Sequence, residues 1–81
     1  MAFIANAANT AQAEVKLSQR EGQCLYWASQ GKSSSDIGKI LNISPRTVDE
    51  HIARACFRLG VRTRVQAIQA ALRLGLLDAT P

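Results

Sequence analysis

Cysteine, histidine and aromatic residues are scarce in this sequence. Its 81 residues include two cysteines, one histidine and four aromatic residues. Cys24 and Cys56 are far apart, no CxxC pair is present and the only histidine is His51, so the ligand spacing of a zinc site is missing. A small secreted domain held together by disulfides usually carries more cysteines. We therefore expect reduced cysteines, no metal and a cytoplasmic protein.

Long apolar runs are missing as well. No apolar run approaches the roughly 18 residues that suggest a membrane span, and the apolar start lacks the basic segment of a signal peptide. A length of 81 residues allows one domain, which excludes multidomain enzymes and dinucleotide folds. No glycine-rich phosphate loop or paired carboxylates on one face occur. We expect neither an enzyme nor a cofactor, and no small-molecule ligand for this chain.

Helix boundaries are the clearest signal in the sequence. Apolar residues make up 47% of it, enough for a small core. Residues 1–16 are rich in Ala, Asn and Gln and are expected to be a flexible N-terminal arm or linker; residues 17–77 are the expected domain and 78–81 a tail. Each helix is expected to start at a capping residue, in three cases within a capping-box pattern: Ser18, Ser33, Ser44 and Thr63. Each is expected to end at a residue that tolerates a positive φ: Gly31, Asn42, Gly60 and Gly75.

Apolar residues recur between these boundaries at helical spacing. The pattern predicts a compact all-α domain of four helices, near residues 19–30, 34–41, 45–59 and 64–74. Tyr26, Trp27 and Phe57 are expected at the edge of the core. The predicted core-facing stripes are Glu21, Cys24, Leu25 and Ala28; Ile37, Ile40 and Leu41; Val48, Ile52, Ala55 and Leu59; and Val65, Ile68, Leu72 and Leu76.

The second and third helices have the dimensions of a helix-turn-helix, in which the second helix of the motif enters the DNA major groove. A plain corner between two helices is the alternative. Charge favours DNA. Residues 45–64 hold five arginines and two acids, a net +3 out of the total +4, and arginine forms bidentate contacts with phosphate and guanine.

An ordered set of motifs runs through the predicted domain: Leu17-Ser18-x-Arg20-Glu21, Gly31-Lys32-Ser33, Asp36-Ile37-Gly38, Ile43-Ser44-x-x-Thr47-Val48-x-x-His51 and Leu59-Gly60-Val61. With Arg64 and Ala67, these residues resemble the LuxR-type DNA-binding domain over about residues 17–77. Trp27 and the segment 44–49 are most similar to the branch of quorum-sensing regulators.

The resemblance implies a bacterial transcription regulator that binds double-stranded promoter DNA as a homodimer. Helix 45–59 would lie in the major groove. Helix 64–74 would form the dimer contact through Ile68, Ala71 and Leu72. The expected phosphate contacts are Ser34, Ser35, Ser44, Thr47 and Arg58. His51 is expected either to touch the DNA backbone or to be structural, and Arg64 to pair inward with Glu21.

Three positions of helix 45–59 depart from the family pattern. Many members carry basic residues at 49 or 53, whereas this chain has Asp49, Glu50 and Ala53. The two acids would either accept hydrogen bonds from cytosine N4 or stabilise the start of the helix through its dipole. Arg46 and Arg54 are the expected substitutes for base contact.

A second function from a different class is also compatible with the sequence. The chain starts at Met1 without a sensor domain, and the two acids weaken the DNA face. An interaction module that binds and inhibits a related regulator through helix 64–74 is therefore the alternative hypothesis.

Overall fold

Four helices make up the part of the chain that the computed structural model describes, residues 15–77: α2 (Gln19–Ser29), α3 (Ser34–Leu41), α4 (Pro45–Leu59) and α5 (Arg64–Arg73). The same residues form no strand. The predicted all-α, four-helix fold is confirmed, with the first and last helices each ending one residue earlier than expected. The expected arm and tail lie outside the described residues, apart from Val15 and Lys16. No helix within 15–77 has the length and apolar character to cross a membrane.

The predicted caps begin the helices as expected. At α2 the Glu21 N–H donates to Ser18 Oγ (3.1 Å), and the Ser18 N–H donates to Glu21 Oε1 (3.0 Å). Thr63 begins α5 with the same reciprocal arrangement. At α3 one of the two bonds of the predicted capping box forms: Ser33 Oγ accepts from the Asp36 N–H (3.1 Å). The second bond, from the Ser33 N–H to the Asp36 side chain, is absent among the described residues.

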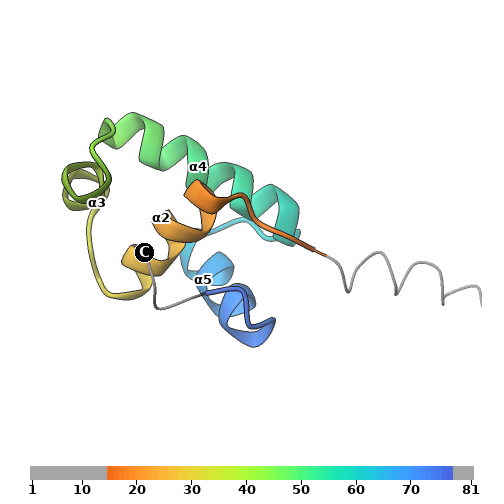
Figure 1. Cartoon of the computed structure of the whole chain (residues 1–81). Coiled ribbons are helices and arrows are strands. Elements are labelled where there is room, and N and C mark those ends of the chain that lie inside the picture. The colour runs from red at the N-terminus through yellow and green to blue at the C-terminus, as the bar shows by residue number, and fades with distance from the viewer. Residues whose placement is uncertain (1–14, 78–81) are drawn as a thin grey trace, which may run out of the picture.

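Helix α4 is the element around which the others pack. It contacts α2, α3 and α5, and Figure 1 shows it as the longest ribbon, with α3 near one end. The predicted core stripe of α4 is confirmed: Val48, Ile52 and Ala55 are buried and Leu59 packs against them. The other buried apolar residues are Cys24, Leu25, Ile37, Ala67, Ala70 and Ala71.

Gly38 allows the closest approach between α3 and the turn that follows it. Asn42 ends α3 in the left-handed conformation (φ 60°), and the Ile43 N–H donates to the Gly38 carbonyl (2.9 Å). A Cβ on Gly38 would lie 2.5 Å from the Ile43 carbonyl oxygen, well inside van der Waals contact. Glycine is therefore required for this spacing of the helix-turn-helix.

The predicted core stripe of α5 is half right: Ile68 and Leu76 pack against the core, but Val65 and Leu72 do not. Val65 and Leu72 are 61% and 58% exposed, whereas Ala67, Ala70 and Ala71 are buried. Alanine brings no bulky side chain between helices, so it suits a helix that packs closely against α2 and α4. The larger residues are left on the outside, with Ile68 at the boundary between the two faces.

Two further core predictions are also wrong. Phe57 is 88% exposed and Ile40 is 45% exposed. Phe57 lies two residues after Ala55 and two before Leu59, which turns it to the side of α4 opposite the core. Tyr26 and Trp27 are half-buried as expected.

Candidate nucleic-acid interface

The outward face of α4 is the surface on which the expected DNA-contacting residues gather. Arg46, Glu50, Ala53 and Phe57 are spaced by four, three and four residues, which places them on one helical stripe, and all four are exposed. Arg54 lies beside this stripe and is also exposed. We call these five residues the outward face of α4.

Arginines dominate the charge on and around this face. The Arg46 side chain is 89% exposed and its Nε lies 3.5 Å from Glu50 Oε2, a pairing along the helix that solvent largely screens. Arg54 makes no ion pair within residues 15–77. Arg62, in the turn after α4, is exposed as well.

Arg58 is held in place by a buried carboxylate. Its Nε lies 2.9 Å from Glu21 Oε1, and the Glu21 side chain is 3% exposed while that of Arg58 is 50% exposed. The expectation that Arg64 would pair with Glu21 is therefore wrong. Arg58 comes from α4, the helix against which α2 packs, so one edge of its guanidinium meets Glu21 while the side chain remains half open to solvent.

Arg64 instead joins a chain of hydrogen bonds that links three helices. Arg64 Nη1 donates to Ser34 Oγ (3.3 Å), and the Ser34 hydroxyl donates to Asp49 Oδ1. The first residues of α3 and α5 are thereby tied to α4. Asp49 accepts from a protein hydroxyl and therefore links α4 to α3. The Ser34 hydroxyl, which we expected to face phosphate, is part of the same link.

The remaining expected phosphate contacts surround the start of α4. Ser44 Oγ accepts from the Thr47 N–H (3.0 Å), and the two hydroxyls are 2.9 Å apart. Pro45 occupies the first helical position. Ser35 is exposed in the first turn of α3. The hydroxyls of Ser44 and Thr47 are thus both part of the helix cap, and Thr47 is half-buried.

His51 is half-buried on the side of α4 next to the core. Its Nδ1 is buried and has no hydrogen-bond partner within the part of the chain that the structure describes.

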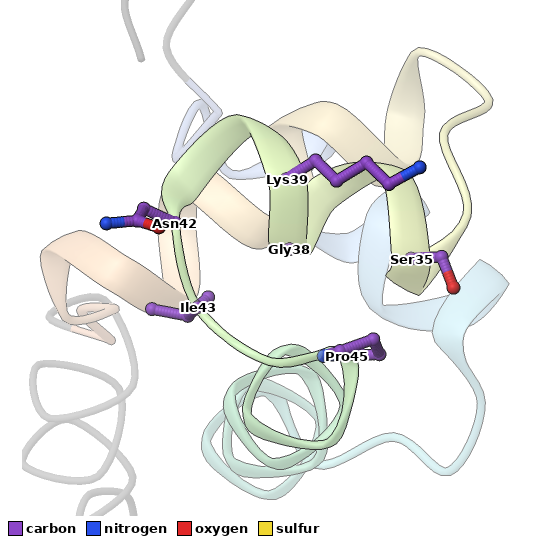
Figure 2. Close-up of a pocket in the computed structure, with 6 residues that line it drawn as sticks. All are labelled: Ser35, Gly38, Lys39, Asn42, Ile43 and Pro45. Atoms are coloured by element: carbon purple, nitrogen blue, oxygen red, sulfur yellow. The ribbon is translucent and has the colours of Figure 1, made fainter.

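A hollow of about 330 Å³ lies between α3 and the start of α4. Figure 2 shows Lys39 extending along α3 on one side, with Ile43 from the turn and Pro45 at the start of α4 on the other. Lys39 is exposed and adds a cation beside the motif that the sequence analysis did not single out. The hollow is lined by Ser35, Gly38, Lys39, Asn42, Ile43 and Pro45.

The cysteines take no part in this surface. Burial raises the pKa of the Cys24 thiol, an effect that Arg20 and Arg64 oppose in part, and burial also raises the pKa of Cys56. Burial therefore disfavours the thiolate form of both cysteines, which is the form that acts as a nucleophile or metal ligand. Residues 15–77 contain no cluster of three His, Cys, Asp or Glu side chains that could hold a metal ion.

A tight helix-turn-helix and an arginine-rich outward face on its second helix define a class, the helix-turn-helix DNA-binding domains. Comparison with known proteins gives the family. Residues 15–71 match GerE, described as bacterial regulatory proteins of the luxR family. The chain belongs to this family and is a LuxR/GerE-type DNA-binding domain of a transcription regulator. The family is one of transcription regulators and not of enzymes.

Individual relatives and a solved structure agree with this assignment. The transcriptional activator VanR of Vibrio anguillarum is 47% identical over 62 residues, 76% of this chain and 26% of that protein. LuxR of Aliivibrio fischeri is also 47% identical over 62 residues, 76% of this chain and 25% of that protein. The structure of the transcription factor GerE has a TM-score of 0.73 and 40% identity, covering 76% of this chain and 92% of that one. The chain thus spans about a quarter of the curated relatives it matches.

Proposed function

We propose that this domain binds duplex DNA as a homodimer, with α4 in the major groove and α5 forming the contact between two copies. The observation that carries the first part is the outward face of α4. It is exposed over its length, it carries Arg46 and Arg54, and Arg58 and Arg62 lie beside it. An α-helix fits the major groove, and arginines along its flank supply the phosphate contacts that position it.

The roles of individual side chains follow from their present partners. Arg54 has no ion pair within residues 15–77 and is the best placed to reach a base edge or phosphate. Arg58 offers its solvent-facing edge to phosphate while Glu21 holds the other edge. Ser35, exposed in the first turn of α3, presents its hydroxyl where backbone N–H groups also favour an anion. Ser44 and Thr47 act mainly by shaping the start of α4.

A titration of labelled duplex DNA at several salt concentrations tests the DNA-binding part. Affinity should fall steeply with salt, by a logarithmic slope of about −0.9 for each phosphate neutralised. The substitution Arg54→Ala should make that logarithmic slope shallower by about one unit for each bound copy of the domain. Arg20→Ala is the matched control, because Arg20 is an exposed arginine on α2 that hydrogen-bonds Gln23, and it should leave the slope unchanged. A folded protein that binds no duplex at low salt would overturn the proposal.

Exposed apolar side chains on α5 support the dimer. Val65 and Leu72 are more than half exposed, and with the half-buried Ile68 they form one stripe at helical spacing. Ala71, which we expected in the contact, has no exposed surface and cannot touch a second chain. The proposed contact is therefore Val65, Ile68 and Leu72.

Leu72→Glu tests this contact. The substitution should weaken self-association at least about tenfold, because symmetry brings two carboxylates together in the dimer. The fold of the single chain should change little, since Leu72 is 58% exposed. Sedimentation analysis with and without DNA measures the effect, and Ile40→Glu, at an exposed apolar residue of α3, is the control. Equal self-association of the two variants would contradict the assignment of α5.

The alternative hypothesis, an interaction module that inhibits a related regulator, is tested with the same domain in the DNA titration and in a binding assay with such a regulator. One of the two features that motivated it is the pair of acids on α4, and in the structure Asp49 bonds Ser34 while Glu50 pairs with Arg46. A folded domain that captures a related regulator and shifts no DNA would favour that hypothesis over ours.

A further inference from the structure

Phe57 is the largest exposed apolar side chain on the outward face of α4. It is 88% exposed, and it borders a hollow of about 370 Å³ that is lined by Ala53, Arg54, Phe57 and Arg58. Ala53 is one helical turn before Phe57 on the same stripe, so the two form a continuous apolar strip. This strip has no covering element within residues 15–77.

The surroundings of the strip indicate what covers it. Arg54 and Arg58 line the same hollow, so an apolar protein surface that covered Phe57 would also have to take two guanidinium groups out of water, at a high cost in free energy. A DNA duplex offers phosphates to those groups. In its major groove the exposed apolar group of the bases is the C5-methyl of thymine, which alanine and phenylalanine side chains contact.

We propose that Ala53 and Phe57 read a thymine methyl group in the major groove, so that Phe57 determines part of the sequence specificity. This inference rests on the proposed DNA-binding function and deepens it. Asp49 accepts from the Ser34 hydroxyl, and Arg46 and Glu50 share an exposed pair. The apolar strip and Arg54 are the groups of this face without a polar partner within residues 15–77.

Helix geometry places the thymine within the half-site. Phe57 is eleven residues after Arg46, which corresponds to about 16 Å along the helix axis. At about 3.4 Å per base step, the two side chains are separated by at most about five base steps. The thymine read by Phe57 therefore lies toward the end of the half-site that faces the C-terminus of α4, away from the base pairs near Arg46.

Replacing thymine by deoxyuridine tests the proposal, because it removes only the C5-methyl and keeps the pairing with adenine. A preferred site is first selected from duplexes with a randomised core, and each thymine is then replaced in turn. The wild-type domain should lose affinity roughly fourfold at one thymine of each half-site, the effect of removing one buried methyl. The variant Phe57→Ala should bind the thymine site more weakly and lose clearly less than fourfold with deoxyuridine, because only the contact of Ala53 with the methyl remains. Thermal unfolding of Phe57→Ala should match wild type because the ring is almost fully exposed.

Ile40→Ala is the matched control, since it removes an exposed apolar side chain from α3 instead of α4, and it should keep the wild-type response to deoxyuridine. Equal responses of wild type and Phe57→Ala at every thymine would overturn the assignment of Phe57 while leaving the DNA-binding function standing. Loss of self-association in Phe57→Ala with an unchanged response to deoxyuridine would overturn it too, and would assign the strip to a second copy. If the wild-type domain selects no duplex at all, the proposed function fails and this inference fails with it.

Discussion

Glu21→Ala is expected to lower the free energy of unfolding by about 2–3 kcal/mol, through loss of a helix cap together with a charge-assisted hydrogen bond. One carboxylate oxygen serves both interactions: Glu21 Oε1 accepts from the Ser18 N–H at 3.0 Å and from Arg58 Nε at 2.9 Å. Alanine removes both and leaves space in a site where Glu21 is 2% exposed. The half-exposed Arg58 regains water, which keeps the loss below that of a fully buried ion pair.

Thermal or urea unfolding followed by circular dichroism measures this change. For a domain of this size, each kcal/mol corresponds to roughly 4–8 °C in Tm, so Glu21→Ala should melt well below wild type. Glu21→Gln keeps an acceptor oxygen and should lose only about 1 kcal/mol, the charge-assisted part of the Arg58 bond.

Glu50→Gln is the matched surface control for this prediction. It neutralises a carboxylate that pairs with Arg46 on the outside of α4, where the Glu50 side chain is 51% exposed, and exposed pairs contribute less than about 1 kcal/mol. Comparable destabilisation by Glu21→Ala and Glu50→Gln would show that the buried pairing with Arg58 has no special weight.

Local signals explain why the helix boundaries were predictable from the sequence. A cap such as Ser44, the proline after it and a terminator such as Gly60 act within a few residues of the backbone that they stabilise, so the sequence carries the whole interaction. The same holds for the core stripe of α4, where apolar residues occupy one face and polar or small residues most of the other.

Helix α5 shows where this reasoning fails. It has two apolar faces, one of Val65 and Leu72 and one of Ala67 and Ala71, and periodicity cannot say which face the rest of the fold covers. In the structure the alanine face is the buried one, because packing depends on the distance between helices as well as on hydrophobicity. The large residues left outside are the ones that now support the dimer proposal.

Partners that come from distant parts of the chain were likewise beyond prediction. Glu21 had two arginines within plausible reach in the fold, and the geometry selects Arg58 over Arg64. The sequence predicted α4 and its arginines as the DNA-contacting surface, and in the structure Arg46 and Arg54 lie on an exposed face of that helix. The bond between Ser34 of α3 and Asp49 of α4 could not be predicted, because it depends on how the two helices are placed relative to each other.

Gly38→Ala is expected to destabilise the domain by about 1–2 kcal/mol, although alanine is the better helix former. The added Cβ would lie 2.5 Å from the Ile43 carbonyl oxygen and 3.4 Å from Pro45 N. Those atoms are backbone, so α3 or the turn must move, and overpacking of this kind costs typically about 1–3 kcal/mol. The gain in helix propensity, up to about 1 kcal/mol, offsets only part of that cost.

Gly22→Ala makes the comparison sharp, because it is the same chemical change inside a helix without the steric conflict. Gly22 lies in α2 and a Cβ there meets nothing within 4 Å, so this variant should gain about 0.5–1 kcal/mol. Unfolding of both variants under one set of conditions should therefore separate them by about 1.5–3 kcal/mol, in opposite directions from wild type. Gly38→Ala should also weaken DNA binding, since a displaced α3 moves Ser35 and Lys39 relative to α4. If both variants stabilise equally, α3 and its turn do not need a glycine at this contact.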